Sequence, residues 1–167
     1  MPKLEELNGL SREEFTRILA PAFEHSPWVA ARTAAQRPFQ SVADLHAALC
    51  QTVEKARDDE KLALIRAHPD LGDKAELTIE SQSEQASAGL HRASPGEVKQ
   101  FRENNRRYRE RFGFPFVICA RENKKEAIQR VFASRLQNSR EQEVETALQE
   151  IYKIANLRLH DLIQRTA

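Results

Sequence analysis

Apolar residues recur every three or four positions along most of this chain, a spacing that predicts helices rather than strands. The first stripe runs through Phe15, Ile18 and Leu19 to Phe23, and Pro21 is expected to bend or end its helix. We expect about eight helices in all, over residues 11–23, 28–36, 41–53, 58–67, 80–89, 94–113, 123–136 and 140–165. No repeat, low-complexity stretch or linker separates them, so residues 1–167 are predicted to form one all-α, single-domain helical bundle.

Several boundaries carry residue types that favour helix ends. Ser11, Ser94 and Asn123 each precede an acidic residue by three positions and are predicted N-terminal caps. Gly89 and Gly113 are predicted to end the helices before them, because glycine readily adopts the left-handed backbone of a C-terminal cap.

The stretch over residues 112–121 departs from helical spacing. It is almost continuously apolar, and Pro115 within it excludes a regular helix. We therefore predict one buried extended segment over residues 112–121. Its main-chain donors and acceptors need partners, and a ligand rich in amide-like groups, neighbouring protein and water all remain open as alternatives.

Charge and cysteine content narrow the class of protein. The chain has 26 basic and 25 acidic residues, a formal net charge of +1, which gives no general attraction to nucleic acid or to an anionic membrane. Cys50 and Cys119 lie among apolar residues without metal-ligand spacing and are predicted to be reduced and buried. Because no apolar run approaches the roughly 20 residues that span a bilayer, and no targeting signal is evident, we expect a soluble cytoplasmic protein.

The strongest candidate chemistry begins at His68-Pro69-Asp70-Leu71. Thirteen residues after the histidine, Ser81, Glu84 and Gln85 stand at i, i+3 and i+4, which on a helix places them on one face. An imidazole, a carboxylate and two neutral hydrogen-bonding groups suit proton transfer on a small polar molecule. Simpler structural roles stay open: His68 could cap the preceding helix, Glu84 could be an exposed carboxylate, and Ser81 could be an N-terminal cap.

Arg158 stands within the apolar stripe of the last predicted helix, beside residues such as Ile151, Ala155 and Leu162. A guanidinium there needs an anionic ligand, a route to water, or a protein acid such as Glu84. The sequence pattern does not decide between a ligand and a protein partner.

Other chemistries have weaker support. His68, Asp70, Asp73 and Glu76 lack the spacing of a known metal motif, so no metal is predicted. The arginines between residues 102 and 111 alternate with glutamates, which is typical of a solvated helix face. No serine or cysteine has the context of a nucleophile elbow.

Five motifs follow one another along the chain. They are Arg37-Pro38-Phe39, His68-Pro69-Asp70-Leu71, the stretch 77–90 with Ser81, Glu84 and Gln85, the stretch 108–117 with Phe112-Gly113-Phe114-Pro115-Phe116-Val117, and Ile154-x-x-Leu157-Arg158-Leu159. In this order, and over nearly the whole chain, they resemble the 2-oxo-4-hydroxy-4-carboxy-5-ureidoimidazoline (OHCU) decarboxylase family of urate breakdown.

The resemblance implies an all-α enzyme that converts OHCU to (S)-allantoin and carbon dioxide with no metal or organic cofactor, usually as a homodimer. It implies His68 as the catalytic residue and Glu84 as part of the substrate-binding helix start; from the chemistry of the side chains we further expect Glu84 to act with His68 in catalysis. The substrate-binding residues that it implies are Pro69, Ser81, Gln82, Ser83, Gln85, Phe116, Val117, Ile118, Cys119, Ala120, Arg121 and Arg158. We expect the imidazole, the carboxylic acid and the core-facing guanidinium to enclose a single small cavity.

Two other functions are weighed against this one. A non-catalytic helical interaction module would show these residues dispersed over the surface. A hydrolase acting on the preceding intermediate, 5-hydroxyisourate, is disfavoured because its β-rich, transthyretin-related scaffold is not predicted here.

Overall fold

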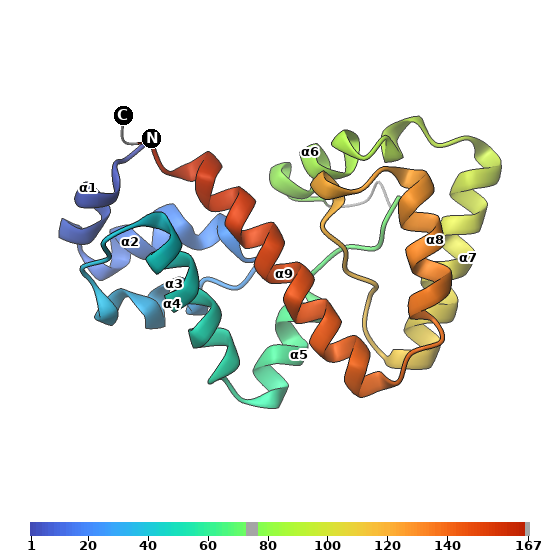
Figure 1. Cartoon of the computed structure of the whole chain (residues 1–167), viewed down its shortest axis with the longest axis horizontal. Coiled ribbons are helices and arrows are strands. Elements are labelled where there is room, and N and C mark those ends of the chain that lie inside the picture. The colour runs from blue at the N-terminus through green and yellow to red at the C-terminus, as the bar shows by residue number, and fades with distance from the viewer. Residues whose placement is uncertain (73–76, 166–167) are drawn as a thin grey trace. The chain divides into compact units, whose positions relative to one another are not determined.

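The computed structural model describes residues 1–72 and 77–165 (Figure 1). These residues form nine α-helices joined by turns and short 3₁₀ helices, and no strand occurs among them. The all-α prediction is therefore confirmed. Asp73 and Glu76, two residues of the weak metal-ligand alternative, lie outside the described residues.

The chain divides into two compact units, which we call unit 1 and unit 2. Unit 1 comprises Met1–Ala67 and Tyr152–Ala167, and unit 2 comprises His68–Ile151. The last helix, α9 (Arg140–Leu162), supplies residues to both.

Unit 1 contains the first five helices and the C-terminal part of α9. The helices are α1 (Leu4–Gly9), α2 (Arg12–Leu19), α3 (Trp28–Thr33), α4 (Val42–Glu54) and α5 (Asp58–Arg66), with 3₁₀ turns η1 (Ala20–Ala22) and η2 (Ala34–Gln36). Helix α3 packs against both α2 and α4. Phe15, Leu19, Val29, Leu45 and Leu49 are buried in this unit, as their apolar spacing predicts.

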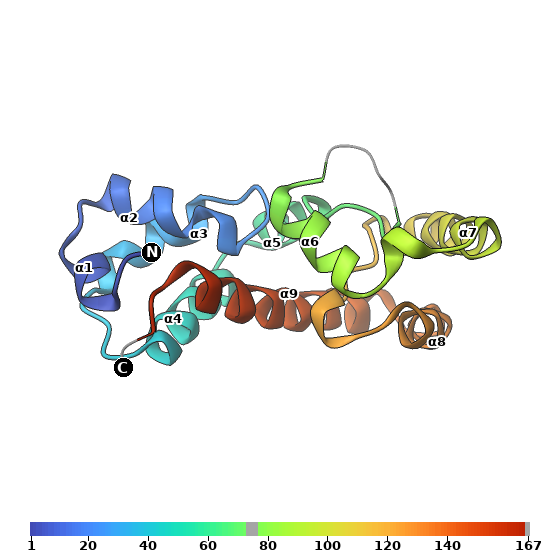
Figure 2. The same ribbon diagram turned by 90° about the horizontal axis from the view of Figure 1, so that it is seen from above.

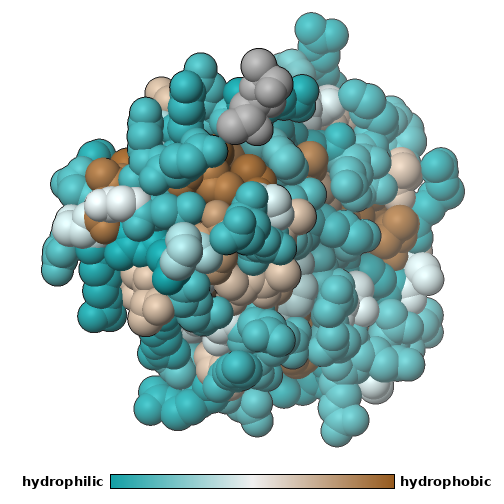
Figure 3. All heavy atoms as spheres, turned by 60° about the vertical axis from the view of Figure 1, so that its left-hand side comes forward, coloured by the Kyte–Doolittle hydropathy of each residue, from teal (hydrophilic) through white to brown (hydrophobic). Residues whose placement is uncertain are grey.

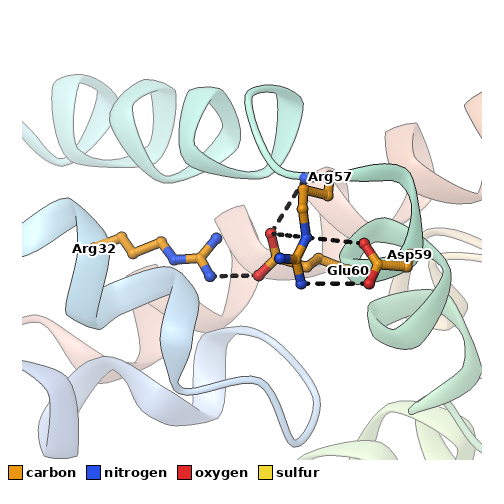
Figure 4. Close-up of polar contacts among 4 residues, drawn as sticks. All are labelled: Arg32, Arg57, Asp59 and Glu60. Carbon is orange, nitrogen blue, oxygen red and sulfur yellow. Dashed lines mark hydrogen bonds and ion pairs between the residues drawn. The ribbon is translucent and has the colours of Figure 1, made fainter.

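A cluster of charged side chains joins α3 to the start of α5 within unit 1 (Figure 4). Glu60 accepts hydrogen bonds from the Arg32 guanidinium and, at 3.2 Å, from the Arg57 main-chain N–H. Arg57 also pairs with Asp59, at 3.1 Å from Nε to Oδ1. Chiefly through the Arg32 hydrogen bond, and then through that of Arg57, the pKa of the Glu60 carboxyl falls to about 2.

Unit 2 is built from three helices and the N-terminal part of α9. The helices are α6 (Ile79–Ser87), α7 (Pro95–Phe112) and α8 (Lys125–Arg135), with 3₁₀ turns η3 (Leu90–Arg92) and η4 (Ala120–Glu122). Helices α7 and α8 lie side by side in both ribbon views (Figures 1 and 2). Their core is aromatic: the Tyr108 ring lies edge-on to Phe114, Phe116 and Phe132, and Phe116 stacks on Phe132 with 3.8 Å between centroids.

The predicted helix ends are mostly confirmed, with corrections. Ser94 and Glu97 form the full capping box, and Gly89 and Gly113 have φ of 86° and 80° at the ends of their helices. The box at Ser11 is only half formed, because the Glu14 carboxylate pairs with Arg17. The cap predicted at Asn123 is wrong: Lys124 holds that position, and the Asn123 amide donates to the Cys119 carbonyl at 2.9 Å.

Helix α1 is absent from the predicted set. It has only six residues, of which Leu4 and Leu7 are buried, and this is too short for a recognisable repeat.

Hydrophilic residues cover most of the face shown in Figure 3, with smaller apolar areas between them. Within residues 1–72 and 77–165, no helix combines the length and apolar character needed to span a membrane.

Candidate active site

The motif His68-Pro69-Asp70-Leu71 opens unit 2 as a turn that follows directly on α5. Pro69 restricts the backbone of His68 to extended conformations, so α5 ends before the histidine. His68 is 7% exposed, which makes it a buried histidine rather than a solvated one.

Helix α7 holds this turn through two side chains. The Asn105 amide donates to the Leu71 carbonyl at 2.9 Å, and Arg109 Nε donates to both carboxylate oxygens of Asp70 at 2.9 and 3.1 Å. At the end of the turn, Gly72 has a φ of 75°, a left-handed conformation that favours glycine. The turn is thus fixed by groups more than thirty residues further along the chain.

Helix α6 presents the predicted polar face. Ser81, Glu84 and Gln85 are buried, at 5%, 9% and 8% exposure. Gln82 and Ser83 are exposed, as the helical period requires for the positions between them. The buried face places the three side chains of the sequence motif together.

The simpler roles considered for two of these residues are wrong. Thr78 caps α6, because its hydroxyl accepts the Ser81 main-chain N–H at 3.1 Å, so Ser81 is not the N-terminal cap. Glu84 is not an exposed carboxylate. The hydroxyl of Ser81 and the carboxylate of Glu84 are therefore buried polar groups, which need hydrogen-bonding partners.

Gln85 connects α6 to the His68 turn. Its side-chain Oε1 accepts the Gly72 main-chain N–H at 3.1 Å. Two motifs that are separate in sequence are thereby joined in one unit.

The segment predicted as buried and extended packs close to α6. Residues 114–120 are buried, and no helix or strand is assigned over residues 115–119. Helix α6 packs against η4, which directly follows this segment (Figures 1 and 2). The Lys125 N–H donates to the Ala88 carbonyl at 2.9 Å, and Lys124 Nζ to the Ser87 carbonyl at 2.8 Å.

Protein groups satisfy part of this segment's main chain. Arg135 Nη1 donates to the Val117 carbonyl at 2.7 Å, and the Cys119 N–H donates to Glu150 Oε1 at 3.2 Å. Neighbouring protein is thus a partner of the main chain at Val117, Cys119 and Ala120, and a ligand at the other positions stays a prediction. Arg121, within η4, is half-buried.

The pKa of Cys119, in the segment, is influenced by a charge on α6. Burial raises the pKa of the Cys119 thiol to about 11, and the negative charges of Glu122, Glu150 and Glu84 add to the rise. The thiol is therefore protonated at neutral pH, which is unsuitable for a nucleophile. Both cysteines are free, as predicted, but only Cys119 is fully buried.

Arg158 lies in unit 1 and has a protein carboxylate as partner. Its Nη2 donates to Glu24 Oε2 at 2.9 Å and its Nη1 to the Pro21 carbonyl at 3.0 Å. The two side chains of the ion pair are 4% and 1% exposed. Of the alternatives that the sequence leaves open for Arg158, pairing with a protein acid is the one observed, but the acid is Glu24 and not Glu84. The role of Arg158 in substrate binding, and its convergence with His68 and Glu84, stay predictions.

The sequence pattern does not identify two residues that support the candidate site, Asn105 and Arg109. It predicts a solvated helix face for the arginines between residues 102 and 111, which holds for Arg106 with Glu103 and Glu110, whereas Arg109 binds Asp70. Asn105 carried a usable signal, because it interrupts the apolar stripe of Phe101, Tyr108 and Phe112 as Arg158 interrupts its own.

Comparison with known proteins identifies the family. A family model described as OHCU decarboxylase matches residues 8–160. The chain is 43% identical over 159 residues to the 2-oxo-4-hydroxy-4-carboxy-5-ureidoimidazoline decarboxylase of Halalkalicoccus jeotgali, covering 95% of this chain and 90% of that protein. It is 43% identical over 156 residues to the protein of the same name from Haloferax volcanii, covering 93% of each.

A solved structure agrees. The crystal structure of an (S)-allantoin synthase superposes with a TM-score of 0.82 at 28% identity, covering 98% of this chain and 54% of that one, so this chain spans about half of that protein's length. Together with the sequence relatives, this match confirms the resemblance that the five motifs indicate. The chain belongs to the OHCU decarboxylase family.

Proposed function

We propose that this chain decarboxylates OHCU to (S)-allantoin and carbon dioxide, the reaction for which its family is named. The observation that carries the proposal is the joining of three distant elements within unit 2. The His68 turn is bonded to α6 through Gln85, and α6 packs against the end of the 114–120 segment. A dispersed interaction surface, the alternative function, would not require this arrangement.

The chemistry of the substrate explains why polar side chains suffice. The carboxylate of OHCU is attached to a carbon that also carries a hydroxyl and neighbours an imine-like ring carbon. When the carbon–carboxylate bond breaks, the electron pair can pass to the adjacent C=N group. The hydroxyl then loses its proton to become a ring carbonyl while the neighbouring carbon gains a proton, which gives allantoin with one net proton taken up. The protein must orient the substrate, stabilise the developing charge and deliver the proton to one face.

In this mechanism His68 and Glu84 flank the reacting carbon. His68, tuned by Glu84, polarises or deprotonates the hydroxyl and then serves as proton donor after carbon dioxide leaves. Burial of both side chains supports this assignment, because a weakly solvated site strengthens such interactions.

The remaining residues bind and orient the substrate. Pro69 borders the histidine, and the polar groups of α6 over residues 81–85 orient the ureido and ring groups. The main chain over residues 116–120 binds the ring amides, and Arg121 and Arg158 neutralise anionic oxygens. No metal or organic cofactor takes part, and the protein acts as a cytoplasmic homodimer.

The test is to generate OHCU in situ from urate with a urate oxidase and a 5-hydroxyisourate hydrolase. Circular dichroism then follows the appearance of optically active (S)-allantoin with and without this protein, in the presence of a chelator. The proposal predicts faster formation of (S)-allantoin that the chelator leaves unchanged. A rate equal to the spontaneous one would reject the activity, and acceleration abolished by chelator would reject the cofactor-free mechanism.

A further inference from the structure

Two side chains hold the main chain between Val117 and Cys119. The Val117 carbonyl accepts a hydrogen bond from Arg135 Nη1 at 2.7 Å, and the Cys119 N–H donates one to Glu150 Oε1 at 3.2 Å. Both residues of the segment are at most 3% exposed, so neither group has water as an easy substitute.

Arg135 is itself firmly placed. Its Nε donates to Glu143 Oε1 at 2.8 Å, and the two side chains of this ion pair are 7% and 0% exposed. Glu143 also accepts the Tyr108 hydroxyl at 2.5 Å and the Asn138 amide at 2.9 Å. The guanidinium of Arg135 lies over the Phe116 ring, 4.2 Å from its centroid. Helices α7, α8 and α9 thus combine to fix one guanidinium against the segment.

Ile118 lies between the two anchored residues. Among the described residues, no hydrogen bond is made by its main-chain N–H or carbonyl, although the residue is only 5% exposed. In extended chain, successive residues direct their main-chain groups to opposite sides. Anchoring residues 117 and 119 on one side therefore directs the Ile118 N–H and carbonyl to the other.

We propose that Arg135 and Glu150 are positioning residues that hold this segment so that the Ile118 main chain receives an amide-like group of the substrate. A main-chain donor and acceptor on one residue complement an N–H and a carbonyl on a ureido or ring amide. This inference rests on the proposed function. It adds the two side chains that act through the segment and the residue whose main chain they present.

Glu150 offers the cleanest test, because the replacement can keep or remove the acceptor. Glu150→Gln retains an acceptor oxygen for the Cys119 N–H, whereas Glu150→Leu has none. We expect Glu150→Leu to raise KM by about 3- to 10-fold, the range of one net hydrogen bond, with kcat changed less than about 2-fold. Glu150→Gln should stay within about 2-fold of the parent in both constants.

Leu148→Ala is the matched control on the same helix, because Leu148 is buried and 2% exposed. It should lower the melting temperature without raising KM, which separates a general loss of stability from a loss of positioning. Amide hydrogen exchange at Cys119 gives a readout independent of activity and should accelerate in Glu150→Leu but not in Glu150→Gln.

Arg135→Lys is a second, independent variant. Lysine keeps the charge but cannot donate to Glu143 and Val117 with the geometry of a guanidinium, so KM should again rise. The inference is overturned if Glu150→Leu has the KM of Leu148→Ala, or if Glu150→Gln behaves like Glu150→Leu. If the parent protein itself does not accelerate allantoin formation, the proposed function fails instead.

Discussion

The side chain of Gln85 accepts a hydrogen bond from the main-chain N–H of Gly72, at 3.1 Å. This contact joins the α6 face to the end of the turn that begins at His68, across thirteen residues of sequence. It gives Gln85 two separable tasks: its oxygen holds the turn, while its NH₂ group is available for the substrate role proposed above.

Substitution of Gln85 should separate these tasks. Gln85→Glu keeps an oxygen acceptor for Gly72 but has no amide NH₂, so we expect a lower kcat/KM; its added buried charge also lowers stability, so the Gly72 contact needs an uncharged variant. Gln85→Met loses both groups and should lower the unfolding free energy by about 1 kcal/mol relative to the parent. Urea unfolding of Gln85→Met and steady-state kinetics on both variants check this, and parental stability of Gln85→Met would contradict the role of the Gly72 contact.

Asn105 and Arg109 should differ in importance although both bind the turn. Asn105 is 6% exposed, so Asn105→Leu leaves the Leu71 carbonyl without its donor and should cost about 1–3 kcal/mol of stability, together with activity. The Arg109–Asp70 pair is 47% and 24% exposed, so Arg109→Met should cost less than about 1 kcal/mol. The reverse order in thermal unfolding would show that the surface pair holds the turn.

The buried Arg158–Glu24 pair should contribute strongly to the stability of unit 1. Removing one partner leaves the other charge buried, so Arg158→Met and Glu24→Gln should each lower the unfolding free energy, with Arg158→Met costing about 3–5 kcal/mol. If Arg158 also binds an anionic oxygen of the substrate, Arg158→Met should raise KM more than Glu24→Gln does. Equal KM values in the two variants would limit Arg158 to a structural role.

The lowered pKa of Glu60 predicts that unit 1 loses stability at acidic pH. Its folded-state pKa is lowered to about 2 from an ordinary value near 4.5, chiefly by Arg32 and then by Arg57. A lowered carboxyl pKa stabilises the folded state above the unfolded pKa, and this contribution disappears as the pH falls from about 4.5 to about 2. Glu60→Gln should therefore lose less melting temperature between about pH 6 and about pH 3 than the parent. Identical pH profiles for Glu60→Gln and the parent would contradict the shift.

The sequence predicted those features that depend on local spacing. The apolar stripes located most helices, Pro115 indicated the non-helical segment, and the spacing of Ser81, Glu84 and Gln85 placed them on one buried face. The Asn123 cap failed because the asparagine amide has a better partner in the Cys119 carbonyl, which spacing alone does not reveal.

Long-range partners were beyond the reach of such patterns. Glu24 stands 134 residues from Arg158, and the Asp70 partner of Arg109 is 39 residues away, so nothing local assigns either pair. Glu150 does carry a local signal, because it is a charged residue among buried positions of α9, as Arg158 is, and such a residue needs a partner. The rule that a polar residue in an apolar stripe needs a partner identifies such positions, but only coordinates supply the partner.

The most direct test of the catalytic assignment is the initial rate of (S)-allantoin formation by His68→Ala and Glu84→Gln, measured by circular dichroism on freshly generated OHCU. With melting temperatures close to that of the parent, each variant should lose about 10²- to 10⁴-fold in kcat, the range of general acid–base catalysis. Parental rates and parental product handedness in both variants would contradict the assignment.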